Sequence, residues 1–253
     1  MKFKRLIPAL AMLLVSAILL GTSTFAWFSM NTTVSATNMQ ITAKSDSVFL
    51  LISNTNTTAP TIQAENATTV AETVAAADAK VYPSAYENIT TAADFATVGN
   101  WYTAAAQQPT ASTMKADTKA SLNADDESDA TVHDFSDYVI KKTYYFTLAA
   151  GSNAAQNLVV SKVSKTMNNT ANGSAETNAA MKIVVVGTNY VEFTNTDNDG
   201  DATVLAASLT DSTVVSVDVY IYFDGNDTSV YTNNVANLEG AQFDLEFSVT
   251  PAA

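Results

Sequence analysis

The stretch that decides the fold is VVSVDVYIYF, residues 214–223. Its apolar and polar positions alternate, with Val215, Val217, Val219, Ile221 and Phe223 on one parity and Ser216, Asp218, Tyr220 and Tyr222 on the other. Successive side chains of a β-strand point to opposite faces of the sheet, so this period of two predicts a strand. We expect its aliphatic face to meet a core and its second face to meet solvent.

The same alternation recurs along the chain. It covers residues 243–249 and 140–148, and shorter apolar runs lie at 158–163, 183–186, 191–193, 34–43 and 48–52. Clusters of Asn, Asp, Gly and Ser, which favour turns, separate these runs, and no long helical pattern comes between them. The sequence therefore predicts an all-β fold, an antiparallel β-sandwich rather than a parallel sheet.

Residues 53–134 differ from this plan because they are rich in Ala and Thr and only weakly periodic. A structureless loop of that length would be unusual in a compact domain. The stretches 70–79, 92–97 and 114–122 can each form a short helix, so we expect a partly helical insertion. Five aromatic residues are expected to pack it against the edge of the sandwich: Tyr82, Tyr86, Phe95, Trp101 and Tyr102.

The composition excludes several classes of function. The 253 residues include 12 Lys+Arg against 25 Asp+Glu, and Arg5 is the single arginine. Nucleic-acid binding depends on clustered Lys and Arg, so it is excluded. Cysteine is absent and His133 is the single histidine, which leaves little material for thiol, triad or zinc chemistry. We therefore expect no enzymatic activity.

Residues 1–26 have the layout of a secretory signal peptide. Three basic residues (Lys2, Lys4 and Arg5) precede the apolar run 6–20, which ends in a short polar stretch. Removal of this segment would shift the formal net charge from -13 to -16, because it holds three basic residues and no acid. We expect residues 27–253 to form a single β-sandwich domain that carries the insertion.

A signal peptidase needs small side chains three residues and one residue before its cut. Thr24 and Ala26 meet that need and place the cut before Trp27. The alternative is an uncleaved anchor over residues 6–28, which is barely long enough to span a bilayer. In both cases the body of the protein would lie outside the cytoplasmic membrane, secreted or at the cell surface.

The junction also points to a family. Residues 24–29 (TFAWFS), followed by 34–36 (VSA) and 39–43 (MQITA), resemble the cleavage region and first strand of Gram-positive secreted proteins related to TasA and camelysin. In that family the SipW peptidase handles signal peptides whose junction has the form A-[FWY]-F-[ST]. Further likeness lies in Tyr82-Pro83-Ser84, Trp101-Tyr102 and residues 219–225 (VYIYFDG).

This resemblance implies a jelly-roll-like sandwich that is exported and assembles into extracellular fibres or matrix. In TasA-like fibres an N-terminal segment of one subunit can complete the sheet of its neighbour. The long insertion departs from the family pattern.

The residues give a separate reason to expect assembly. Cleavage would leave Trp27 and Phe28 at the start of an uncharged arm that runs through Val34 to Ile41. An extended apolar arm with free backbone groups can pair with the open sheet edge of another copy. The alternative is that the arm folds back onto its own sheet as an ordinary first strand.

Residues 197–201 (DNDGD) place Asp197, Asp199 and Asp201 two residues apart, and calcium accepts several carboxylates in one site. The spacing does not match an EF-hand, whose glycine comes later and whose twelfth position is Glu. Asn, Asp and Gly are turn residues, so we favour a polar turn over a calcium site. We expect no cofactor and any calcium affinity to be no tighter than about millimolar.

We therefore expect a structural protein of a Gram-positive cell surface or biofilm matrix, whose partner is itself as a homopolymer, with an accessory matrix protein as a further candidate. After cleavage it would have no membrane contact. The main alternative is a secreted carbohydrate-binding or adhesion module that stacks sugars on Trp101, Tyr102, Tyr220 and Tyr222. A third and weaker alternative is a secreted protease, an activity ascribed to camelysin, but no zinc-ligand motif supports it.

N-terminal sequencing of the exported protein should begin at Trp27, because Thr24 and Ala26 satisfy the peptidase. A membrane-bound protein that begins at Met1 would contradict this prediction and support the anchor.

Overall fold

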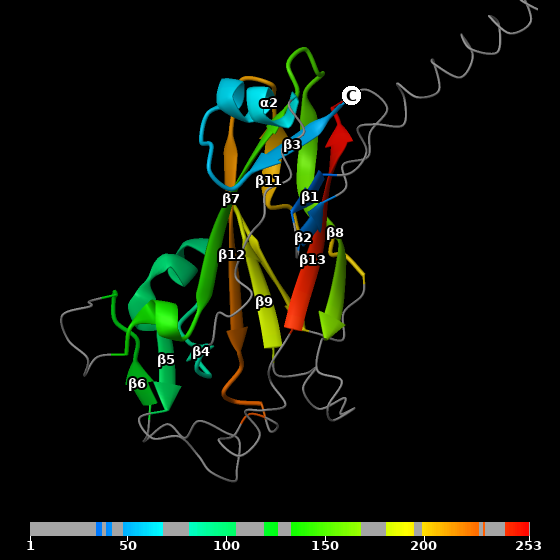
Figure 1. Ribbon diagram of the computed structural model, residues 1–253. Helices are drawn as coiled ribbons and strands as arrows, with labels where there is room; N and C mark the ends of the chain where they lie inside the picture. Colours follow the sequence, from blue (N-terminus) through cyan, green and yellow to red (C-terminus); the bar gives the residue numbers. More distant parts are fainter. Residues whose placement is uncertain are drawn as a thin grey trace, which may run out of the picture.

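A computed structural model of the chain describes residues 34–36, 39–41, 48–67, 81–104, 119–125, 133–167, 181–194, 199–227, 230 and 241–252. Within these residues, eight strands build two packed sheets (Figure 1). They are β3 (Leu50–Ser53), β7 (Ile140–Leu148), β8 (Ala155–Met167), β9 (Met181–Val186), β10 (Tyr190–Thr194), β11 (Ala206–Leu209), β12 (Val215–Phe223) and β13 (Ala241–Pro251).

The strand order confirms a jelly-roll-like antiparallel sandwich. One sheet has the order β10-β9-β12-β7-β3 and the other has the order β11-β8-β13, with antiparallel pairing throughout. Along the chain, β7 to β13 pass repeatedly from one sheet to the other, and only β9 and β10 follow each other within a sheet. Such crossing connections are the mark of the jelly roll.

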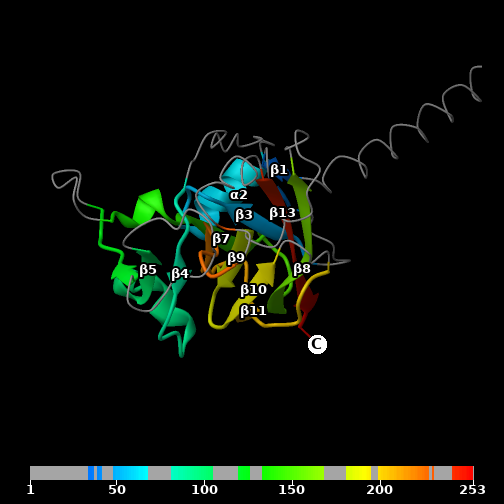
Figure 2. The ribbon, with the colours of Figure 1, turned by 90° about the horizontal axis from the view of Figure 1, so that it is seen from below.

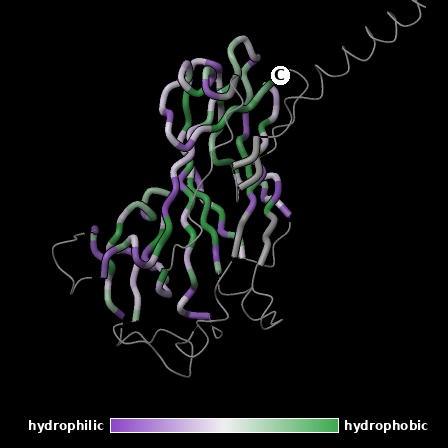
Figure 3. Tube along the Cα trace, viewed as in Figure 1, coloured by the Kyte–Doolittle hydropathy of each residue, from purple (hydrophilic) through white to green (hydrophobic). Residues whose placement is uncertain are grey.

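The core lies between the two sheets. Val217 and Val219 of β12 are fully buried there, as the alternation of VVSVDVYIYF predicted. Phe146 of β7 meets Phe247 of β13 across the core, with ring centroids 4.8 Å apart. Figure 3 shows hydrophobic residues concentrated along the strands of this sandwich. Burial of such side chains is the main favourable term in folding, roughly 1.5–3 kcal/mol for each large residue.

The part of the insertion that carries Phe95 and Trp101 packs on the outer face of the five-stranded sheet, so the prediction that these residues pack at the sandwich edge is wrong. The helix at residues 59–67 lies instead beside β3, which is an edge strand of that sheet. The described elements of the insertion are α2 (Ala59–Ala67), β4 (Ala85–Tyr86), η2 (Ala92–Ala96), η3 (Val98–Asn100), β5 (Trp101–Ala104) and β6 (Lys119–Ser121), and the 3-10 turn η5 (Phe135–Asp137) leads back to β7. Figure 2 shows β4 and β5 on one side of this sheet and β8 and β13 on the other. The partly helical character is confirmed. The helix predicted over 114–122 is wrong where the chain is described, since 119–121 is a strand.

Tyr220 and Tyr222 were expected to face solvent, and that expectation is also wrong. Their side chains are 1% and 2% exposed, because Trp101 of β5 covers them. The Trp101 ring centroid is 5.7 Å from that of Tyr220 and 5.2 Å from that of Tyr222. Phe95 completes the packing, and its carbonyl accepts the indole N–H of Trp101 at 3.1 Å. A second hydrophobic cluster thus covers the outer face of the sheet.

Local hydrogen bonds explain two of the short helical elements. The Asp94 carboxylate accepts the backbone N–H groups of Thr90 at 2.8 Å and Thr91 at 2.6 Å, which starts η2 and lowers the pKa of Asp94 to about 2. In α2, Ile62 is fully buried. The Gln63 amide donates to the carbonyls of Leu148 and Asp211, each at 2.8 Å, so α2 is held to the end of β7.

Trp101→Ala should lower the free energy of unfolding by about 3–5 kcal/mol, the usual cost of removing a buried aromatic side chain. Chemical denaturation followed by circular dichroism measures this change. Phe49→Ala is the control, because Phe49 is 57% exposed, and it should stay within about 0.5 kcal/mol of the unaltered protein. Equal losses of unfolding free energy in the two variants would mean that packing of the Trp101 side chain does not hold the insertion in place.

Candidate functional site

The described part of the acidic segment, residues 199–201, is held against β8 and by local hydrogen bonds. The carboxylate of Asp201 accepts the Thr203 N–H at 2.7 Å, and the Asp201 N–H donates to the Val160 carbonyl at 2.9 Å. Gly200 lies so close to β8 that a Cβ there would overlap the Ser161 and Val160 carbonyl groups. Asp199 is exposed, and Asp197 lies outside the described residues.

The described part of the chain contains no group of three or more acidic or histidine side chains that could hold a metal ion. Triad chemistry would depend on His133. Its Nδ1 shares a hydrogen bond of 2.7 Å with the Tyr138 hydroxyl, and its ring packs edge-on against the Tyr138 ring. It therefore helps to pack the end of the insertion.

The aromatic residues that would have stacked on sugars are buried. Trp101 is 0% exposed and lies over Tyr220 and Tyr222 of β12, and Tyr102 is 6% exposed. A sugar ring cannot reach these faces without removal of the insertion. Trp101, Tyr220 and Tyr222 belong to one packed cluster, whereas Tyr102 packs separately against Ala85.

The signal-cleavage residues Thr24, Ala26 and Trp27, together with Phe28, lie outside the described residues. The later part of the arm forms a hairpin of β1 (Val34–Ala36) and β2 (Met39–Ile41), in which Val34 pairs with Ile41. Val34 and Ile41, the two positions expected to act in the arm, are thus paired with each other in this hairpin. The hairpin lies beside β13, with β2 next to it (Figure 1).

β13 is the edge strand of the three-stranded sheet. One side of it pairs with β8 over most of the length of both strands. Among the described strands, none continues the hydrogen-bonded ladder on its other side, and the β1–β2 hairpin forms a separate sheet. An edge strand carries a row of unpaired backbone N–H and C=O groups.

The sandwich divides its eight strands unevenly, five in one sheet and three in the other. The cause is β3, which pairs with β7, so that Leu50 lies opposite Leu148 and Ile52 opposite Phe146. An even division would put a fourth strand in the smaller sheet, and β13 is one of the two edges where it could be added. This edge is the candidate site for assembly.

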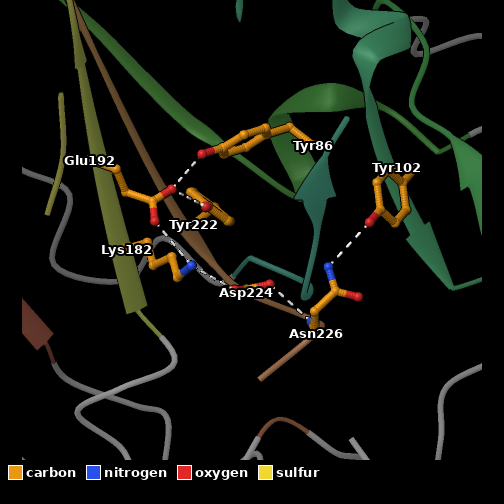
Figure 4. A network of polar contacts seen from close by, with 7 residues as sticks. All are labelled: Tyr86, Tyr102, Lys182, Glu192, Tyr222, Asp224 and Asn226. Carbon is orange, nitrogen blue, oxygen red and sulfur yellow. Dashed lines mark hydrogen bonds and ion pairs between the residues drawn. The ribbon is translucent and has the colours of Figure 1, made fainter. Parts of the chain in front are cut away.

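A polar network lies where the insertion meets the five-stranded sheet (Figure 4). The Glu192 carboxylate of β10 accepts the hydroxyls of Tyr86 at 2.6 Å and Tyr222 at 3.0 Å. Its second oxygen lies 3.0 Å from the Lys182 Nζ, and the same Nζ lies 2.8 Å from the Asp224 carboxylate. Lys182 therefore lies between two carboxylates from neighbouring strands.

The ionisation of this network follows from its burial and its charges. Burial, followed by the hydrogen bond and charge of Glu192, raises the pKa of Tyr86, and burial with the charge of Glu192 raises that of Tyr222 further. Burial lowers the pKa of Lys182, but the hydrogen bonds and charges of Asp224 and Glu192 outweigh it, so that pKa is raised. The tyrosines are neutral and the lysine is charged at neutral pH.

Sequence reasoning missed this network because strand register brings its members together. Lys182 of β9 pairs with Tyr222 of β12 on one side and with Thr194 of β10 on the other. Glu192 and Asp224 each lie two residues along the chain from those partners, on the same faces. The alternation in the sequence gives the faces but not which strands are neighbours.

Comparisons with protein-family models, with curated proteins and with solved structures each found no match. In the described residues, no helix is long and apolar enough to cross a membrane.

The free energy of unfolding should fall as the pH rises above about 10, the ordinary pKa of tyrosine. Above that pH the unfolded chain loses protons that folded Tyr86 and Tyr222 retain, since both pKa values are raised in the folded state. Each such group contributes about 1.4 kcal/mol of lost stability per pH unit. Denaturant titrations across this range measure the effect.

Tyr222→Phe should make that pH dependence shallower by about one group's contribution. Tyr82→Phe is the matched control, because Tyr82 is 52% exposed, and it should leave the dependence unchanged. If Tyr222→Phe has the same alkaline profile as the unaltered protein, the hydroxyl is not held neutral by the fold.

Proposed function

We propose that this protein is a secreted structural protein of the cell surface or biofilm matrix that assembles into fibres by exchange of its N-terminal arm. The observation that carries the proposal is that β13 is an edge strand of its sheet and that the arm hairpin, a separate sheet, lies beside it. An arm from one copy can add a strand to that edge in another copy, as in other cases of strand addition. Such a head-to-tail contact builds a filament when its rotation does not close into a ring.

The acceptor edge has the length and polarity that strand addition needs. β13 spans Ala241–Pro251, long enough for several added backbone hydrogen bonds. Its inward side chains Leu245, Phe247 and Val249 are buried in the core, so the strand is firmly held. Its described outward positions are Asp244, Glu246 and Ser248, and charged side chains on an edge discourage indiscriminate pairing. An uncharged arm suits such an edge better than a second acidic one.

The hairpin gives the monomer a resting state for the arm. In a single copy, Val34 pairs with Ile41 and the hairpin covers the region beside β13. Exchange would replace the three register pairs of this hairpin, Val34–Ile41, Ser35–Gln40 and Ala36–Met39, with a longer ladder on a neighbour. The fold-back and arm-exchange alternatives are thus two states of one segment, and concentration would select between them.

Composition and resemblance support export and a matrix role. The sequence lacks cysteine and has no arginine after Arg5, which fits neither catalysis nor nucleic-acid binding. The junction TFAWFS resembles the TasA and camelysin family, whose members assemble outside the cell. The carbohydrate-binding alternative loses its support because Trp101, Tyr220 and Tyr222 are buried.

Deletion of residues 27–33 from the mature protein should abolish polymerisation and leave the sandwich folded, because the core strands from Ile140 to Val249 stay intact. Light scattering and electron microscopy measure assembly, and circular dichroism reports the fold. Salt should promote assembly of the full mature protein, since copies near -16 repel each other and salt screens this repulsion beyond about 10 Å at 0.1 M.

Val34→Pro should weaken assembly by removing a backbone donor from the arm, whereas Val34→Thr keeps that donor and serves as the matched control. Equal polymerisation by the deleted and full proteins would overturn arm exchange. A protein that stays monomeric at every salt and protein concentration would overturn the fibre function itself.

A further inference from the structure

Lys182 contacts two carboxylates at once. Its Nζ is 2.8 Å from the Asp224 Oδ2 and 3.0 Å from the Glu192 Oε1 (Figure 4). All three side chains are largely shielded, with exposed fractions of 22% for Lys182, 25% for Glu192 and 14% for Asp224. The structure thus holds three groups together: the Lys182 amine, the Asp224 carboxyl group and the Glu192 carboxylate.

We propose that Lys182 and Asp224 form an intramolecular amide bond, with Glu192 carrying the proton. The three groups supply the nucleophile, the electrophile and the acid–base group that amide formation needs. Held contact also replaces a collision between free groups, which is worth many orders of magnitude in effective concentration. Each protein molecule would undergo this reaction once, on its own side chains.

The reaction balances without any co-reactant. Glu192 takes one proton from the Lys182 ammonium, and the neutral Nζ attacks Cγ of Asp224 to form a C–N bond. The proton held by Glu192 and a second proton from Nζ leave with one carboxyl oxygen as water, and that C–O bond breaks. The products are a neutral amide and one water molecule, and Glu192 returns to its starting charge.

The surroundings hold the reacting groups in place. Tyr86 and Tyr222 donate to one Glu192 oxygen, which leaves the other directed at Lys182. The second Asp224 oxygen accepts the Asn226 N–H at 2.9 Å. On the backbone, the Ser84 N–H donates to the Phe223 carbonyl, so the insertion fixes the end of β12 beside the lysine.

Other ion pairs of the described chain lack this combination. Lys141 lies 2.9 Å from Asp218 and is 39% exposed, Lys162 lies 3.2 Å from Glu246 and is 53% exposed, and Lys119 lies 2.7 Å from a 46% exposed Glu87. Each of these pairs has a single carboxylate at the amine. They serve as internal controls, since contact between lysine and an acid is common on protein surfaces and does not by itself lead to an amide.

The bond would close a covalent loop between residues 182 and 224, and so join β9 to the end of β12. A cross-link of this kind restricts the unfolded chain in the way a disulfide does. The chain contains no cysteine, so an amide is a cross-link that remains open to it. The junction it would fasten is the one on which the insertion rests.

Mass spectrometry of the purified, denatured mature protein tests the proposal. We expect most molecules to be lighter than the unmodified chain by the mass of one water molecule. Proteolysis should release a branched peptide that joins Lys182 to Asp224, and trypsin should not cut after Lys182. Peptides that contain Lys141 and Lys162 should be linear. A full-length mass without this loss, with ordinary cleavage after Lys182, would overturn the proposal.

A different reaction could also remove water, because Asp224 precedes Gly225 and such pairs can form a cyclic imide. The Gly225 N–H donates to the Ser84 carbonyl at 2.9 Å, which directs it away from the Asp224 side chain. Lys182→Arg separates the two reactions. It keeps the charge and removes the reactive amine, so loss of water should disappear. A loss that persists in Lys182→Arg would assign it to the imide and overturn the cross-link.

Two further variants test the assigned roles. Glu192→Gln keeps an acceptor for the tyrosines but removes the proton carrier, so the cross-linked fraction should fall at least tenfold after equal incubation. Asp224→Asn should still react and should lose ammonia in place of water. Circular dichroism checks that both are folded. An unchanged cross-linked fraction in Glu192→Gln would remove Glu192 from the reaction, and if a variant fails to fold, the branched peptide of the unaltered protein decides.

Discussion

The structure depends on the burial of both faces of one strand, β12. Its aliphatic face, with Val217 and Val219, closes the core of the sandwich, and its aromatic face, with Tyr220 and Tyr222, is covered by the insertion. A strand buried on both faces must satisfy every polar group inside the protein, because an unpaired buried hydroxyl is costly. The Tyr222 hydroxyl meets this requirement at Glu192, and that carboxylate in turn needs the charge of Lys182. The polar network is therefore a consequence of placing aromatic residues beneath the insertion.

Much of the fold could be predicted from the sequence, because alternation is a local property. The strands over 140–148, 215–223 and 243–249 follow directly from it, as does the all-β class. The position of the insertion could not be predicted in this way. Tyr220 and Tyr222 read as a half-polar face, since tyrosine suits both a wet surface and an aromatic core, and only the distant Trp101 decides between them. The next described strand after β12 is β13, which lies in the other sheet, and no local pattern in the sequence records that crossing.

The candidate sites also differ in whether a local sequence pattern could predict them. The residue types of the acidic segment predict a turn, and in the described part the Asp201 carboxylate accepts the Thr203 N–H. β13 is an edge strand because β3 pairs with β7 in the five-stranded sheet and does not extend the three-stranded sheet. No short sequence pattern shows which sheet β3 joins. The contact of Lys182 with Glu192 and Asp224 depends on the register of three strands at once. Local patterns thus identify elements and turns, while edges and side-chain clusters arise from the pairing of elements far apart in the chain.

The long ladder between β8 and β13 has a mechanical consequence. Ten register pairs join the two strands, and they run antiparallel along nearly the whole length of both. In a fibre built as proposed, tension would enter a subunit through a neighbour's strand on β13 and pass sideways into β8. Such a load shears the hydrogen bonds together instead of opening them one after another, so rupture would require many to fail at once. The part of the insertion on the far face of the other sheet would bear little of this force and could change in length or sequence without weakening the filament.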